Sequence, residues 1–158
     1  YILKAFKGIV LVINKWDLSS ELSIKKDDVK TKIRNKFKFS EFAPICFTSG
    51  LSGKGLNELI ENVMKVNDEW RKTVPRYDLR RIIMTAIGNN PPSNSGKRIL
   101  KIHSVSQDYT GPPSFTFYVN KPELVHFSYK RYLENCLRDA YSFSGSPIRM
   151  RFKKLGKK

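Results

Sequence analysis

An unbroken apolar run that ends in a polar segment constrains the fold of this chain more than any other feature. Residues 8–13 read GIVLVI, and residues 14–17 read NKWD. A short run rich in β-branched residues predicts a strand buried on both faces, here over residues 8–14. Strands of that kind form parallel sheets, and open parallel sheets bind ligands beyond the carboxyl ends of their strands. The polar segment therefore stands where a ligand is expected.

The residue types in the polar segment suit a guanine base. The Asp17 carboxylate can accept two parallel hydrogen bonds, from a ring N–H and an exocyclic amine, and guanine offers that pair whereas adenine does not. The Asn14 side chain can bridge neighbouring loops and reach a ring nitrogen, and the Lys15 methylenes can cover the flat face of the base. Trp16 lies outside this code and is expected to pack. The alternative is a polar turn that only closes the strand.

A second apolar run is followed by a glycine-rich loop. Residues 43–47 read APICF, which predicts a strand over residues 43–48, and residues 48–56 read TSGLSGKGL. The two polar segments would then lie at adjacent carboxyl strand ends. Taken alone, this loop could equally be a Gly/Ser turn between a strand and a helix.

Both segments resemble the GTPase superfamily. N-K-x-D after a buried strand resembles its guanine-specificity motif, and residues 48–56 resemble its other base-contacting loop. In that loop a Ser-Ala pair presents backbone N–H groups to the guanine carbonyl; Ser49 and Gly50 stand in its place, and glycine keeps the N–H. The sequence contains no G-x-x-x-x-G-K-[ST] phosphate loop. We therefore expect this chain, as given, not to hydrolyse GTP, and we assign it no catalytic residue.

Strand and helix alternate through the first half of the chain. Helices are expected over about residues 23–37 and over residues 56–71, where the apolar positions form one face. This α/β alternation predicts the C-terminal part of a doubly wound domain with a parallel sheet. Thr73-Val74-Pro75 breaks the pattern, so we place this domain at residues 1–74.

The second half has a different order of elements. We expect helix, strand, strand, helix and strand, which is an α+β domain at residues 75–158 with a small antiparallel sheet covered by two helices. The expected elements are helices at 76–89 and 127–141 and strands at 98–107, 114–120 and 146–153.

Positive charge is concentrated in the second half. The chain has 30 Lys and Arg against 14 Asp and Glu, a net charge of +16. Residues 75–158 hold 16 basic and 5 acidic residues, net +11, whereas residues 1–74 hold 14 and 9, net +5. Such an excess favours a polyanionic partner over a merely solvated surface.

Basic residues in this half are candidates for RNA contact, although ordinary surface charge is the alternative for each one. Alternation along the last strand puts Arg149, Arg151 and Lys153 on one face, which makes them the most coherent group. The full set is Lys97, Arg98, Lys101, Lys130, Arg131, Arg149, Arg151, Lys153 and Lys154.

The remaining reactive residue types predict no metal or redox site. Cys46 and Cys136 form no metal-binding or redox motif and are expected to be core thiols, which suits a reducing compartment. No apolar stretch approaches the length of a membrane span, and no signal peptide is visible.

Taken as a whole, the chain resembles the EngA, or Der, family of bacterial GTPases. The resemblance rests on the guanine motif, a Pro hinge, and the segments IIM-x-A, KRILKI, PPSF, YKRYLEN and GSPIR. It implies that residues 1–74 end the second of two tandem G domains and that residues 75–158 form a KH-like domain. It further implies GTP and GDP as ligands, Mg²⁺ in the intact protein, and a role in assembly of the large ribosomal subunit with ribosomal RNA as partner.

By position, the resemblance implies guanine contacts for Asn14, Lys15, Asp17, Ser49 and Gly50. It also implies a monomer in the bacterial cytoplasm or in an organelle of bacterial origin. No GxxG loop occurs in the second half, so phosphate and shape contacts are expected there in place of single-strand readout. Two other functions stay open: a stand-alone RNA-binding module with a structural G-domain remnant, and a nucleotide-independent interaction scaffold.

Overall fold

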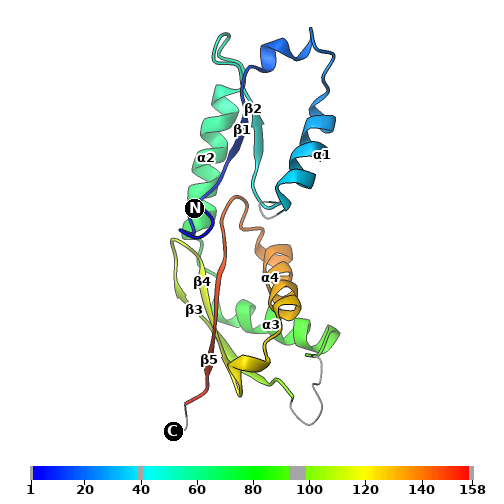
Figure 1. Ribbon diagram of the computed structural model, residues 1–158. Coiled ribbons are helices and arrows are strands. Elements are labelled where there is room, and N and C mark those ends of the chain that lie inside the picture. The colour runs from blue at the N-terminus through cyan, green and yellow to red at the C-terminus, as the bar shows by residue number, and fades with distance from the viewer. Residues whose placement is uncertain (1, 39–40, 93–98, 157–158) are drawn as a thin grey trace. The chain divides into compact units, whose positions relative to one another are not determined.

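The chain forms two compact units, seen in the computed structural model of Figure 1. The structure describes three stretches: residues 2–38, 41–92 and 99–156. The first unit consists of Tyr1–Trp70 with Phe143–Ser146, and the second of Arg71–Ser142 with Pro147–Lys158.

Segment Phe143–Ser146 belongs to the first unit, although the sequence analysis placed it within residues 75–158. The Gly145 N–H donates to the Phe42 carbonyl at 2.7 Å, and the Gly145 carbonyl accepts from the Ile9 N–H at 2.8 Å. Gly145 has φ +67°, and a Cβ there would lie 2.3 Å from a methyl carbon of Val66. Only glycine fits this position, so the close approach of the segment depends on it.

The first unit contains a two-stranded parallel sheet, which confirms the predicted α/β class. β1 (Leu11–Ile13) pairs with β2 (Ile45–Phe47). In Figure 1, α1 (Lys26–Lys36) and α2 (Leu56–Arg71) lie on opposite sides of these strands. The prediction that β1 is buried on both faces is wrong for the described residues, because Val12 is 44% exposed.

The second unit has a three-stranded sheet of order β3-β4-β5. β3 (Ile102–Tyr109) and β4 (Ser114–Val119) are antiparallel, whereas β4 and β5 (Arg149–Lys154) are parallel. The predicted α+β class and element order are confirmed, but the prediction of a purely antiparallel sheet is wrong. The reason is the connection between β4 and β5: α4 (Phe127–Tyr141) returns the chain along the sheet, so the next strand runs parallel.

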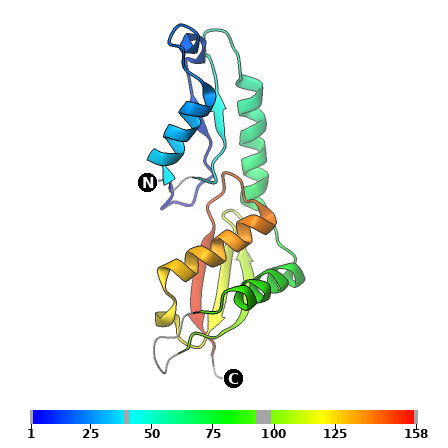
Figure 2. The ribbon, with the colours of Figure 1, turned by 90° about the vertical axis from the view of Figure 1, so that its right-hand side faces the viewer.

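Two helices cover one face of this sheet. Figures 1 and 2 show α3 (Arg76–Asn89) and α4 on the same side of it. The Tyr132 hydroxyl donates to the Ala86 carbonyl at 2.8 Å and so ties α4 to α3. The fully buried apolar side chains between the helices and the sheet are Leu79, Ile83, Phe115, Phe117, Val119, Leu133 and Leu137.

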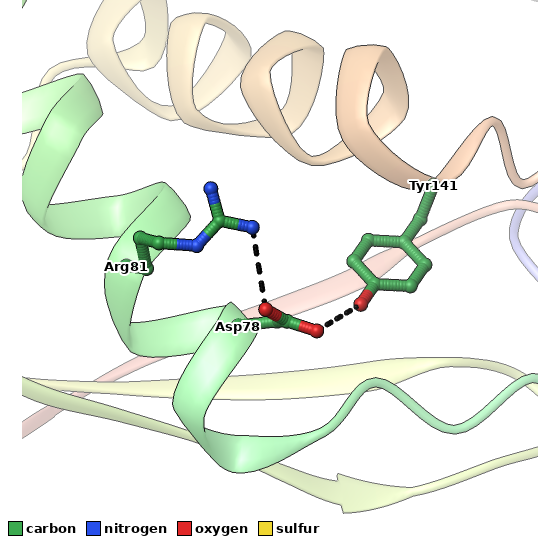
Figure 3. A network of polar contacts seen from close by, with 3 residues as sticks. All are labelled: Asp78, Arg81 and Tyr141. Atoms are coloured by element: carbon green, nitrogen blue, oxygen red, sulfur yellow. Dashed lines mark hydrogen bonds and ion pairs between the residues drawn. The ribbon is translucent and has the colours of Figure 1, made fainter.

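A polar network also joins α3 to the end of α4, as Figure 3 shows. The Tyr141 hydroxyl donates to Asp78 Oδ2 at 2.9 Å, and Arg81 donates to Asp78 Oδ1 at 3.2 Å. The hydrogen bond from Tyr141, and secondarily the bond from Arg81, hold the pKa of Asp78 below its ordinary value. The ionised carboxylate is thus favoured by the folded state.

We expect Tyr141→Phe to weaken the acid sensitivity of the second unit. The pKa of Asp78 is lower in the folded state than in the unfolded state, where it is about 3.9. The ionised Asp78 carboxylate therefore contributes to folding stability above the unfolded pKa, and this contribution is lost as pH falls through the folded pKa. The variant should therefore be less stable than the unchanged chain at pH 7, and the gap should narrow at acid pH. Urea unfolding followed by circular dichroism at several pH values measures this; a gap that stays constant with pH contradicts it.

Candidate functional site

The two predicted base-reading loops meet at the carboxyl ends of β1 and β2. Asn14 joins them, because its Oδ1 accepts from the Lys15 N–H at 2.8 Å, the Gly50 N–H at 3.2 Å and the Thr48 hydroxyl at 3.4 Å. With its oxygen occupied by three protein donors, the Asn14 side chain retains its Nδ2 hydrogens as donors for another group.

Asp17 stands in the first turn of a short 3₁₀ helix, η1 (Trp16–Ser19). Lys15, the residue before η1, has the left-handed backbone conformation with φ +60°. The Trp16 N–H donates to the Thr48 carbonyl at 2.9 Å. The Trp16 ring packs on Phe47 with ring centroids 4.4 Å apart, as the sequence predicts. Among the described residues, the Asp17 carboxylate has no hydrogen-bond or ion-pair partner, so both its oxygens can accept.

Ser49 braces the second loop from inside. Its side chain is fully buried, its N–H donates to the Lys54 carbonyl at 2.9 Å, and its carbonyl accepts from the Gly53 N–H at 2.9 Å. The Ser49 hydroxyl accepts from the Ser52 N–H at 3.2 Å. Ser49 therefore shapes the loop, while its neighbours Thr48 and Gly50 contact Asn14, and Gly50 is exposed.

Gly55 closes the same loop over the end of β2. Its φ is +78°, and a Cβ there would lie 2.1 Å from the Phe47 carbonyl oxygen. Gly53 has a similar φ, +73°, but a Cβ at that position meets nothing within 4 Å. The two glycines share a backbone conformation and differ in the space around them.

The thiol of Cys46, next to this loop, is buried. Cys46 lies on β2 with its side chain fully covered. Burial, together with the charge of Glu58, raises the pKa of Cys46. Cys136 on α4 is only partly buried. Both are free thiols, and Cys46 is placed to report on opening of the first unit.

The structure brings all five predicted guanine-binding residues to one edge of the sheet. It offers a carboxylate with two free acceptor oxygens, an amide with free donor hydrogens and an exposed lysine stem, which together match the edge and face of a planar base. Sequence reasoning missed Thr48, whose hydroxyl and backbone hold the Asn14 loop. Its place directly after β2 was the only signal. That these residues contact guanine stays a prediction.

The basic candidates fall into separate places. Met150 is buried while Arg151 and Lys153 are exposed, so alternation along β5 holds as predicted; Arg149 is half-buried. Lys154 is exposed at the end of β5 and Lys101 before β3. The structure does not bring Lys130 and Arg131 into this group, because they lie on α4. Lys97 and Arg98 lie outside the described residues.

One carboxylate faces the basic side of β5. Asp108 accepts hydrogen bonds from the hydroxyls of Thr116 and Ser106. Those bonds, with smaller contributions from Lys153 and Arg151, lower the pKa of Asp108. A carboxylate already engaged by two hydroxyls only partly offsets the two cations, so this side of the sheet stays electropositive.

Neither a membrane span nor a metal-ligand cluster occurs among the described residues. No helix in that part of the chain has the length and apolarity to cross a membrane. No group of three or more His, Cys, Asp or Glu side chains is placed there to hold a metal ion.

Comparison with known proteins identifies the family. Residues 73–153 match the family described as "KH-domain-like of EngA bacterial GTPase enzymes, C-terminal". The GTPase Der of Halothermothrix orenii is 43% identical over 154 residues, which cover 97% of this chain and 35% of that protein. The GTPase Der of Halalkalibacterium halodurans is 42% identical over 156 residues, 95% of this chain and 34% of that protein.

The matched segment covers almost all of this chain but only about a third of each relative. The GTPase Der of Thermomicrobium roseum, for example, is 38% identical over 96% of this chain but only 34% of its own length. The chain thus spans about one third of the curated relatives that it matches. With a family match across half of its residues and relatives along almost all of them, the chain belongs to the EngA, or Der, family of bacterial GTPases.

Proposed function

We propose that this chain supplies the guanine-recognition loops and the RNA-contacting domain of a GTPase that acts in assembly of the large ribosomal subunit. The observation that supports it most is the junction at Asn14, whose oxygen ties the two loops together while its amide hydrogens and the Asp17 carboxylate stay available. Family membership and relatives named GTPase Der support the GTPase part of this proposal.

In this proposal each residue has a distinct part in reading the base. Asp17 accepts from the guanine ring N–H and exocyclic amine, and the Asn14 amide donates to a ring nitrogen. The left-handed turn at Lys15 lets its methylenes lie over the base. The Gly50 N–H, shared with Asn14 Oδ1, faces the guanine carbonyl, and Ser49 holds the loop that presents it.

The domain assignment is part of the same proposal. Residues 1–74 end a G domain and residues 75–158 form the KH-like domain of a monomeric protein, in the bacterial cytoplasm or an organelle of bacterial origin. GTP and GDP are its ligands. The described residues offer no cluster that fits Mg²⁺, so we assign no step of the function to a metal held by this chain.

The chain alone should be catalytically silent. It lacks a phosphate loop, and phosphoryl transfer depends on that loop for positioning and charge stabilisation. A chimaera in which this chain replaces the matching third of the Halothermothrix orenii GTPase Der, and in which the other nucleotide site is inactivated, should instead hydrolyse GTP and not ATP. Phosphate release by both purified proteins measures this. Turnover by the chain alone would contradict the prediction, and a chimaera that binds no GTP would favour the stand-alone RNA-binding module.

The RNA part of the proposal rests on charge. Residues 75–158 carry a net charge of +11, and β5 presents exposed Arg151 and Lys153 on the side of the sheet opposite the buried Met150. Neutralising RNA phosphates with such residues releases counterions, which makes affinity depend steeply on salt but little on sequence.

Reversing the two exposed charges on the side of β5 opposite Met150, Arg151→Glu with Lys153→Glu, should weaken binding to structured RNA. If each contacts one phosphate, the log–log salt slope should become less steep by about 1.4–1.8. Arg149 is left unchanged because it is half-buried and makes contacts of its own. Salt titrations with fluorescently labelled RNA measure the slope.

The matched control places the same charge change elsewhere. Lys32→Glu with Lys36→Glu alters two exposed lysines of α1 and leaves the second unit untouched. This control should keep the slope of the unchanged chain. Equal losses in both double variants would mean that net charge alone drives binding and would contradict an RNA site on β5.

A further inference from the structure

An exposed aromatic residue begins α4 beside an open concavity. Phe127, the first residue of the helix, is 70% exposed, and it is the one large apolar side chain of α4 that is exposed. The concavity has a volume of about 340 Å³. We call it the Phe127 surface; it is lined by Phe127, Ser128, Arg131, Tyr132 and Asn135.

The spacing of these residues puts them on neighbouring rows of one helix. Phe127, Arg131 and Asn135 are four apart and form one row, and Ser128 and Tyr132 form the next. Each step of four residues rises about 6 Å along the helix. Along this row, which we call the track, the surface therefore presents the Phe127 ring, then the Arg131 guanidinium and then the Asn135 amide.

Electrostatics favour an anionic ligand on this track. The Arg131 guanidinium lies 5.8 Å from the Phe127 ring centroid, and the first turn of α4 contains no acidic residue. Of the two carboxylates of α4, Glu134 is held by Arg138 at 2.9 Å, and Asp139 lies one turn beyond Asn135, at the far end of the row from Phe127 and Arg131. Among the described residues the Asn135 side chain has no hydrogen-bond partner, so its donors and acceptor are available.

The wall of the concavity is fixed before any ligand arrives. Tyr132 is anchored through its hydroxyl to the Ala86 carbonyl of α3 at 2.8 Å. Tyr129, behind it, donates to the Asn90 carbonyl at 3.1 Å, and the two tyrosine rings are 5.7 Å apart. A preorganised wall reduces the entropy lost on binding.

We infer that the Phe127 surface binds an unpaired nucleotide of RNA. One base stacks on the Phe127 ring, Arg131 contacts the adjoining phosphate, and Asn135 hydrogen-bonds to the next nucleotide. This inference deepens the proposed function and rests on it, since it adds a single-strand site to the phosphate contacts of β5. A protein partner would need a contiguous apolar patch, whereas a base needs a single ring.

Phe127→Ala separates stacking from general RNA affinity. The probes are a short single-stranded RNA without self-complementarity and the same strand paired with its complement. Phe127→Ala should weaken single-strand binding by the amount typical of one stacked base, roughly 5- to 150-fold, and change duplex binding by less than about twofold. Phe127→Trp keeps an aromatic ring and should bind the single strand like the unchanged chain.

Two further variants sharpen the test. Tyr77→Ala removes an aromatic side chain that is 77% exposed on α3 and should leave both affinities unchanged. Arg131→Ala should weaken single-strand binding and make its salt slope less steep by about 0.7. Because Phe127 is exposed at a helix end, all variants should melt like the unchanged chain.

The outcomes distinguish this inference from the proposed function. Single-strand affinity that is unchanged in Phe127→Ala overturns the stacking site while leaving RNA binding through β5 intact. Equal losses for single strand and duplex also overturn it, because they show a contribution that is not specific to an unpaired base. If the unchanged chain binds neither RNA, the proposed function and this inference fail together.

Discussion

Asp17→Asn is expected to shift nucleotide selectivity from guanine to xanthine. The change replaces one acceptor oxygen with a donor amide and leaves guanine with an unpaired N–H group, which costs roughly 1–3 kcal/mol, or about 5- to 150-fold in affinity. Xanthine carries a carbonyl oxygen where guanine carries the exocyclic amine, so the new amide can donate to it. Affinities for GTP and xanthosine triphosphate, measured in the chimaera with its other nucleotide site inactivated, test this.

A matched carboxylate provides the control for this exchange. Asp28→Asn makes the same chemical change at an exposed position in the first turn of α1. It should leave both nucleotide affinities as they are. Unchanged GTP affinity in Asp17→Asn, or the same change in both variants, would remove Asp17 from the guanine site.

Gly55→Ala should destabilise the first unit far more than Gly53→Ala does. Both substitutions put alanine into a left-handed conformation, which costs about 1 kcal/mol. At Gly55 the new Cβ would also lie 2.1 Å from the Phe47 carbonyl oxygen, so backbone must move. We expect a total loss of about 3 kcal/mol or more there. Because both variants carry the cost of the left-handed conformation, the difference between their losses of stability measures the steric clash at Gly55 alone.

Cys46 is the reporter for this pair. Its thiol is buried and its pKa is raised, so a maleimide reaches it only when the first unit opens. Labelling should be roughly 100-fold faster in Gly55→Ala and about fivefold faster in Gly53→Ala, with 1.4 kcal/mol per factor of ten. Cys136, in the second unit, should label at the same rate in all three proteins. Equal effects of the two substitutions would show that the Phe47 carbonyl does not confine Gly55.

Helices were the elements that the sequence predicted best. The bounds of α2, α3 and α4 agree with the expected ranges, because each has an apolar face of helical period and a break at its ends. The strands were harder to predict. β1 and β2 are shorter than their apolar runs, since a strand extends only as far as its pairing does. The parallel pairing of β5 leaves no mark in its own residues and follows from the connection through α4.

The candidate site shows the same division between local and long-range information. The alternation of strands with helices was enough to predict that the segments holding Asn14 and Gly50 would lie at adjacent strand ends, and the hydrogen bond between these two residues agrees with it. The inward role of Ser49 could not be predicted, because it depends on the path of the whole loop. The return of Phe143–Ser146 to the first unit likewise depends on contacts with distant residues, Phe42 and Ile9, that no local pattern records.

A crystal structure of the chimaera bound to GDP would test the guanine assignment most directly. We expect both oxygens of Asp17 to lie about 2.7–3.2 Å from the ring nitrogen and the exocyclic amine of guanine, with the Asn14 amide facing a ring nitrogen. We also expect the Lys15 stem to lie over the base and Gly50 to lie beside the guanine carbonyl. A base bound elsewhere on the chain, or one bound here without contact to Asp17, would contradict the assignment of these residues to guanine.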